Sequence, residues 1–204
     1  MTDRQKHTVQ SAHPVPIDSQ VAATLRYIRA TMEAASSIAV PGSAGSAMGI
    51  VGLLAAGLSS TAALRAHWLL IWLLAAVVAA GLGLALMARP ASLRGLTLSG
   101  TPIRKLALCL VPSMFAGLVM TAVHWSSGNL HAIPGTWLLL YGCGLVAASV
   151  PTSGAIAVMG GLFIALGLLA LVLPDGLQTL MLGTGFGGLH LLFGFLIGRA
   201  GHGR

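Results

Sequence analysis

Charged residues are scarce in this sequence of 204 residues: they make up 7% of the chain, whereas ordinary soluble domains contain about 25%. Hydrophobic residues make up 56%, and the mean hydropathy is +0.89. A soluble core of this length could not bury so much apolar surface, so lipid must be the solvent for most of the chain. The composition therefore predicts an all-α integral membrane protein and excludes an ordinary soluble domain.

Acidic residues are rarer still, with four against eleven Lys and Arg, which gives a net charge of +7. None falls inside a predicted span, and proton-coupled transporters usually need a titratable group in their pathway. We therefore expect no proton-driven transporter. The basic excess is typical of membrane boundaries, so no nucleic-acid partner is expected. The two cysteines, Cys109 and Cys143, lie at different depths of predicted spans, so no disulfide is expected.

Six apolar segments without Asp, Glu, Lys or Arg follow residue 45. Each is close to the ~20 residues that cross a hydrocarbon core. Short connections rich in Gly, Pro, Ser and Asn separate them, which favours helical hairpins with short loops. Gly-x-x-x-Gly pairs indicate close helix contacts at Gly45 and Gly49, Gly183 and Gly187, and Gly194 and Gly198. The predicted spans are Ser46–Leu64, His67–Met87, Leu106–Trp125, Ile133–Val150, Ala155–Leu173 and Leu177–Ile197.

The orientation of the six spans follows from the basic residues in the connections. Ten of the eleven Lys and Arg fall on one side of the predicted topology, and only Arg65 falls on the other. The positive-inside rule assigns the basic side to the cytoplasm, so both termini are expected there. Trp68, Trp125 and Trp137 map near the opposite boundary, as in an aromatic belt. We thus expect residues 46–198 to form the transmembrane domain and residues 199–204 a cytoplasmic tail.

An amphipathic helix is predicted before the first span, over residues 19–39. Residues 1–18 are polar and contain two prolines, so a disordered tail is expected there. Charged side chains near the centre of the helix (Arg26, Arg29 and Glu33) argue against a span. The helix is instead expected at the membrane surface or docked on a membrane or cytosolic partner protein. Its apolar stripe, the predicted docking residues, consists of Val21, Leu25, Ile28 and Met32, with Ala35 continuing the spacing.

Four short motifs stand out in and just after this region: Tyr27-Ile28-Arg29, Thr31-Met32-Glu33, Val40-Pro41-Gly42 and Met48-Gly49. On these motifs the chain resembles uncharacterised bacterial multi-spanning membrane proteins. The resemblance covers about residues 24–49 and implies no activity, substrate or site residue. It favours a location in a bacterial inner membrane.

His190 is the one histidine well inside a predicted span. It is our candidate cofactor-binding residue, either as an axial haem ligand or as a hydrogen-bonding partner of a quinone or another small ligand. A second histidine at the same depth is missing, although methionines could serve. The favoured interpretation is structural: polar side chains commonly join membrane helices by hydrogen bonds.

Three histidines and one carboxylate are predicted near the outer boundary: His67, His124, His131 and Asp175. These residue types suit zinc or copper, so they form a candidate metal site. Their spacing matches no known metal motif. The alternative, amphipathic histidine rings placed at the interface, is favoured.

No catalytic residues are predicted, and we do not expect an enzyme. Gly183, Gly185 and Gly188 fit a dinucleotide-binding pattern, but they lie in an apolar span rather than after a strand. The leading expectation is a non-enzymatic accessory or regulatory membrane subunit that engages a partner through its N-terminal helix. The alternatives are a protein that binds a small ligand, haem, quinone or metal through histidines, and a passive carrier of a small solute. No cofactor is required by the sequence.

Overall fold

The computed structural model describes residues 20–28, 41–93, 101–150, 152 and 154–202. The chain divides into two units, residues 1–36 and 37–204, which are considered separately. In the first unit, residues 20–28 are α-helical. Residues 1–18 and 29–39, including Met32 and Ala35 of the predicted stripe, lie outside the described residues.

The second unit consists of helices joined by short turns in its described part and contains no strand there. Its helices are α2 (Gly42–Ser60), η1 (Arg65–His67), α3 (Trp68–Leu93), α4 (Thr101–Ser126), α5 (Ala132–Ser149), α6 (Gly154–Val172), η2 (Asp175–Leu177), α7 (Gln178–Leu182), η3 (Gly183–Leu189) and α8 (His190–His202). Segments α7, η3 and α8 follow one another directly and form the sixth long helix. Among the described residues, six helices are long and apolar enough to span a membrane, which confirms the predicted all-α multi-pass architecture.

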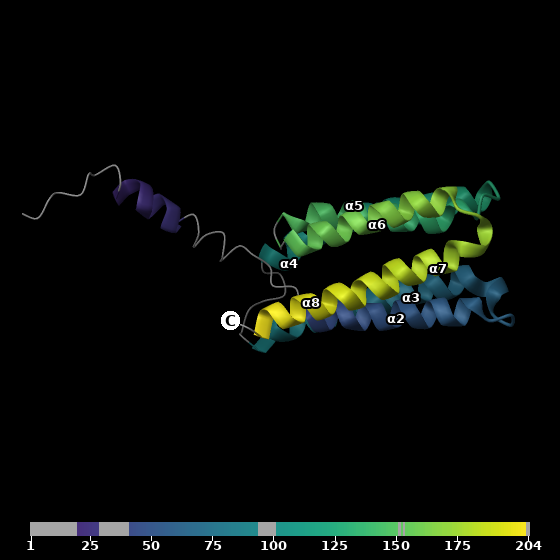
Figure 1. Ribbon diagram of the computed structural model, residues 1–204, viewed down its shortest axis with the longest axis horizontal. Coiled ribbons are helices and arrows are strands. Elements are labelled where there is room, and N and C mark those ends of the chain that lie inside the picture. Colours follow the sequence, from purple (N-terminus) through teal and green to yellow (C-terminus); the bar gives the residue numbers. More distant parts are fainter. Residues whose placement is uncertain (1–19, 29–40, 94–100, 151, 153, 203–204) are drawn as a thin grey trace, which may run out of the picture. The chain divides into compact units, whose positions relative to one another are not determined.

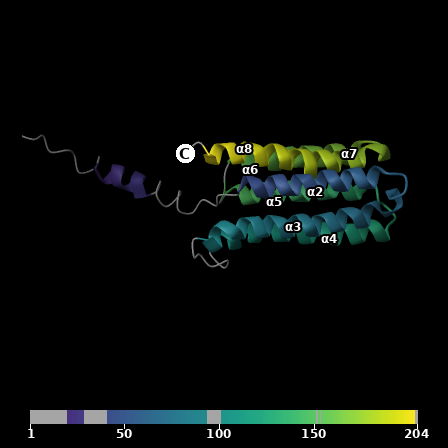
Figure 2. The ribbon, with the colours of Figure 1, turned by 90° about the horizontal axis from the view of Figure 1, so that it is seen from below.

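The six long helices form two layers of three. One layer contains α3, α2 and the α7–α8 helix, and the other contains α4, α5 and α6 (Figures 1 and 2). The middle helices are α2, which contacts α3 and α8, and α5, which contacts α4 and α6. The sixth span therefore lies beside the first span, and its contacts with α6 across the connecting turn are few. The helices of the first two predicted hairpins, α2 with α3 and α4 with α5, pack against each other. In the third predicted hairpin the second helix does not pack along α6 but lies in the layer of α2 and α3.

Some helix boundaries differ from the predicted spans. The first span begins at Gly42, directly after Pro41, and ends at Ser60, four residues earlier at each end than predicted. Proline has no N–H to donate and a fixed φ, so it readily stands at a helix start. Helix α8 continues to His202, so most of the expected tail is helical. Between α4 and α5, Gly128 has φ of 71°, a left-handed conformation that favours glycine.

Two seams between antiparallel helices consist of glycines spaced seven residues apart. In the α5–α6 seam, Gly135 and Gly142 face Gly167 and Gly160. An ideal Cβ on any of these four glycines would lie within 2.9 Å of a backbone atom of the opposite helix. Side chains are therefore excluded, and the two backbones approach directly, as small residues allow in membrane helices.

The α2–α8 seam repeats this arrangement. Gly42 and Gly49 of α2 face Gly194 and Gly187 of the sixth span, again seven residues apart and in antiparallel order. Gly45 and Gly52 add further close approaches. The glycines of the predicted Gly-x-x-x-Gly pairs thus lie at helix contacts. The glycines that face one another across a seam, however, recur every seven residues rather than every four.

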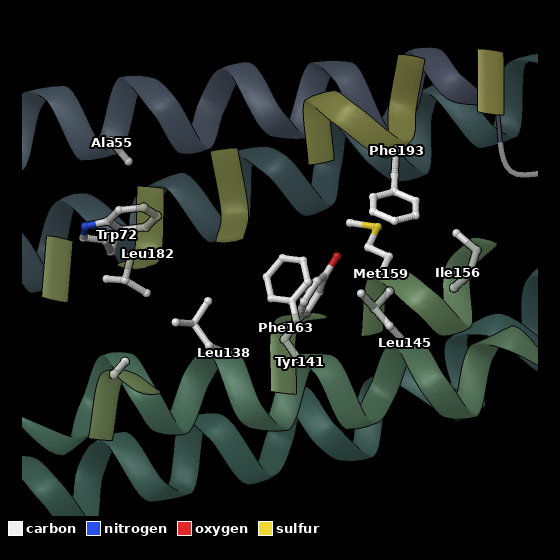
Figure 3. Close-up of a cluster of buried hydrophobic side chains, with 11 residues drawn as sticks. Ala55, Trp72, Leu138, Tyr141, Leu145, Ile156, Met159, Phe163, Leu182 and Phe193 are labelled. Atoms are coloured by element: carbon white, nitrogen blue, oxygen red, sulfur yellow. The ribbon is translucent and has the colours of Figure 1, made fainter. Parts of the chain in front are cut away.

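The buried core lies between the two layers. Figure 3 shows Trp72 of α3, Leu138, Tyr141 and Leu145 of α5, Ile156, Met159 and Phe163 of α6, and Leu182 and Phe193 of the sixth helix in one cluster. Large side chains join the layers, while glycine seams lie within each layer. Cys109 and Cys143 are free thiols, as predicted.

Candidate functional site

His190 lies at the centre of the core, where the sixth span faces the other layer. Only 4% of its surface is exposed. Its Nε2 is 2.7 Å from the hydroxyl oxygen of Tyr141, which comes from α5. An imidazole and a phenol, 49 residues apart in sequence, therefore share a buried hydrogen bond that connects the two layers.

Aromatic rings surround the imidazole. Ring centroids lie 5.4 Å from it at Tyr141 and Phe163 and 6.2 Å at Phe186, whose ring is nearly parallel to it at 16°. Phe163 and Phe186 are also in contact with each other and with Tyr141. We call His190, Tyr141, Phe163 and Phe186 the central cluster. Its rings place His190 in an apolar, water-poor environment in which each polar atom needs a partner.

The segment before His190 is π-helical. It is η3, with the sequence GTGFGGL over Gly183–Leu189. Its glycines allow the sixth span to meet α2 at Gly187 and the side chains of Leu138 and Phe163 at Gly185. A π-helical turn widens the helix and is common at functional sites. Here it directly precedes the buried histidine.

The second ring nitrogen of His190 has no satisfactory partner. Nδ1 is buried and has no hydrogen bond of normal geometry among the described residues. The carbonyl groups of Gly185 and Phe186 approach the imidazole from its own helix. They favour the tautomer with the proton on Nδ1, in which Nε2 accepts a hydrogen bond from the Tyr141 hydroxyl. In this tautomer the Nδ1–H faces the carbonyl groups of its own helix without a hydrogen bond of normal geometry.

This geometry bears on what His190 could bind. Its Nε2 is already occupied by Tyr141, so the nitrogen left for a ligand is Nδ1. A small molecule with a hydrogen-bond acceptor, such as a carbonyl group, matches a donor at Nδ1. Iron ligation by Nε2 would first require the loss of the Tyr141 contact. The prediction that His190 binds a cofactor is not tested by the structure.

The outer histidines have protein partners of their own. His124 Nε2 is 3.2 Å from the Thr136 hydroxyl, and His131 Nδ1 is paired with the Gln178 amide. His67 is exposed and is the last residue of η1, directly before α3. The described part of the chain contains no group of three or more His, Cys, Asp or Glu arranged to hold a metal. Because the side chain of Asp175 is not described, the predicted metal site remains a prediction.

Two of the three tryptophans predicted for the outer belt, Trp68 and Trp137, lie near each other. The rings of Trp68 and Trp137 are 6.5 Å apart, and Trp137 Nε1 donates a 2.7 Å hydrogen bond to the Thr121 hydroxyl. Trp72 lies deeper, and its indole N–H is buried without a hydrogen-bond partner among the described residues.

The described part of the predicted docking stripe is exposed. The exposed fractions are 50% at Val21, 61% at Leu25 and 46% at Ile28. On the polar side, the Arg26 Nε donates a 3.2 Å hydrogen bond to the Ala22 carbonyl oxygen of the same helix.

Sequence reasoning identified His190 but missed the rest of the central cluster. Tyr141 is one of two tyrosines and the one inside a span, which is a usable signal because buried tyrosine hydroxyls usually find partners. Phe163 and Phe186 carry no comparable signal, since phenylalanine is common in membrane spans. Comparison with protein-family models, curated proteins and solved structures gave no match to this chain.

Proposed function

We propose that this multi-pass membrane protein is a non-enzymatic accessory or regulatory subunit whose N-terminal helix docks on a partner protein. The observation that carries the proposal is the exposed apolar stripe of Val21, Leu25 and Ile28 on one face of a helix. Exposed apolar stripes of this spacing typically lie in a hydrophobic groove of another protein. We place the protein in a bacterial inner membrane with both termini in the cytoplasm.

A protein partner explains the stripe better than lipid adsorption does. The stripe is narrow, nearer a coiled-coil seam than the broad face of a deeply buried helix. Interfacial helices usually carry many basic residues on the polar face, whereas the predicted helix over residues 19–39 contains only Arg26 and Arg29. Part of the hydrogen-bonding capacity of Arg26 is used within the helix.

Leu25→Asp tests the docking role. A carboxylate at the centre of the stripe must be desolvated in any apolar groove, so partner recovery should fall at least about tenfold. The matched control is Ala23→Asp, which places the same charge on the opposite face of the same exposed helix. The measurement is co-purification in mild detergent, with thermal stability of each variant recorded in parallel.

Equal recovery of the partner with Leu25→Asp and Ala23→Asp would remove the docking role. A loss of thermal stability with Leu25→Asp alone would instead make the helix part of the folded membrane domain.

Cysteine labelling in intact cells tests the orientation. Cys109 and Cys143 are first replaced by alanine, and single cysteines are then introduced at Ser127, between α4 and α5, or at Val150, after α5. We expect an impermeant maleimide to label position 127 and not position 150, because the basic residues assign the other side to the cytoplasm. The reverse pattern would mean that the orientation is inverted.

A second candidate function is the binding of a small neutral ligand at His190. It is favoured by one observation, the buried Nδ1 that lacks a well-formed protein hydrogen bond. An ionisable residue inside a span is a functional-site candidate by default. The chemistry of the site matches a ligand with a hydrogen-bond acceptor, such as a quinone, that packs against the Phe163 and Phe186 rings.

A further inference from the structure

A shallow hollow lies at the membrane boundary between the beginning of α2 and the end of α8. It has a volume of about 530 Å³ and is open on one side. Three glycines (Gly42, Gly194 and Gly198) leave its floor without side chains, and the walls come from Ser43, Ser46, Phe195 and Arg199. The α2–α8 seam thus ends in a recess.

The recess carries donors and a positive charge. Arg199 supplies a guanidinium group, and two serines on successive turns of α2 supply hydroxyls. The described part of the chain contains one acidic residue, Asp175, at the opposite end of the same span. The recess therefore complements an anion, and no described carboxylate near it would attract a cationic headgroup.

The position of the recess matches the headgroup level of a bilayer. Arg199 is the last residue of the span Gln178–Arg199, and Gly42 is the first residue of the span Gly42–Ser60. One turn further into the membrane, Phe195 is exposed, and the Arg199 guanidinium carbon lies 5.5 Å from the centre of its ring. The part of the recess at the headgroup level is thus basic and lined by hydroxyls, and it adjoins an apolar wall that faces lipid.

We propose that this recess binds the phosphate of an anionic phospholipid. The Arg199 guanidinium contacts the phosphate oxygens, the Ser43 and Ser46 hydroxyls donate hydrogen bonds to them, and an acyl chain runs along Phe195. Arginine pairs well with phosphate because its planar group presents several donors. A soluble phosphate would use the same donors but would gain nothing from the apolar wall.

Native mass spectrometry of the full chain in mild detergent tests this site. The probes are phosphatidylglycerol, phosphatidylcholine and inorganic phosphate. We expect phosphatidylglycerol to bind more tightly than either of the others. Arg199→Gln should weaken its binding about fivefold or more, since one arginine near an anionic surface contributes roughly that factor. The matched control is Arg89→Gln, which removes a charge at the end of α3 outside the recess.

A second variant fills the recess without removing charge. A Cβ on Gly198 would come no closer than 4.0 Å to its nearest neighbour, Gly42 Cα, so Gly198→Ala is sterically permitted, and Gly198→Leu should obstruct the lipid. Equal weakening by Arg199→Gln and Arg89→Gln would reduce the effect to general surface charge and overturn the proposal. Binding of inorganic phosphate as tight as that of phosphatidylglycerol, or lipid binding unchanged by both Gly198→Leu and Arg199→Gln, would also overturn it.

Discussion

Replacing Gly167 by alanine is expected to destabilise the membrane domain by about 3 kcal/mol, at the upper end of the usual cost of overpacking a core. An ideal Cβ at this position would lie 2.6 Å from the backbone nitrogen of Leu139 and 2.9 Å from the carbonyl oxygen of Gly135. Backbone atoms cannot rotate away as a flexible side chain can. Helices α5 and α6 must therefore separate along the seam, which also loosens the contacts of Gly142 and Gly160.

The measurement is reversible unfolding of the purified protein in detergent, with Gly161→Ala as the matched control. Gly161 is on the same helix, and a Cβ there meets nothing within 4 Å. Alanine is favoured over glycine in a helix by about 1 kcal/mol, so Gly161→Ala should leave stability unchanged or raise it. Similar stabilities of the two variants would show that the α5–α6 seam is not closely packed.

Tyr141→Phe is expected to cost about 1 to 2 kcal/mol of unfolding free energy. The substitution keeps the ring and its contacts with Phe163 but leaves His190 Nε2 buried without a partner. The range allows for the modest values that such hydrogen bonds show in membrane proteins. Tyr27→Phe makes the same chemical change at the other tyrosine, which is 73% exposed, and should have almost no effect.

A double-mutant cycle with His190→Leu isolates the hydrogen bond. Each single substitution leaves one buried polar atom unpaired, whereas the double variant removes both, so the double variant should be more stable than the sum of the two losses implies. Additive losses would contradict a direct Tyr141–His190 interaction. The same variants test the ligand-binding candidate: His190→Leu should remove any ligand that co-purifies with the wild-type protein, and a visible absorption spectrum identifies a haem.

The membrane spans were predictable because hydropathy acts locally. Each span is a continuous apolar run of the required length, so the all-α multi-pass fold follows from the sequence alone. Boundaries were less accurate because small polar residues such as Ser46 are tolerated inside helices. The arrangement of the helices was not predictable. Whether the sixth span lies beside the fifth or the first depends on complementary glycine surfaces on helices distant in sequence.

The candidate site, too, could be predicted only in part from the sequence. His190 could be identified from the sequence because a histidine in an apolar span is rare. Tyr141 could be noted as the tyrosine inside a span, but its pairing with His190 could not be predicted, since the contact depends on the rotation of two helices about their axes. The π-helical turn of η3 changes the direction in which the side chains of the sixth span point around its axis. The hydrophobic periodicity of the sequence does not reveal such a turn. The hydrogen bonds of the outer histidines were equally unpredictable, since the pairing of His124 with Thr136 and of His131 with Gln178 also depends on how neighbouring helices are oriented.

Site-specific photo-crosslinking from the N-terminal helix tests the central claim, partner docking, most directly. Thr24 flanks the stripe on the exposed helix, so a benzophenone amino acid at this position would lie at the edge of a docked interface. We predict a discrete adduct with one protein in intact cells, lost with Leu25→Asp and retained with Ala23→Asp. Adducts with lipid alone, or a protein adduct that Leu25→Asp leaves unchanged, would contradict the proposed function.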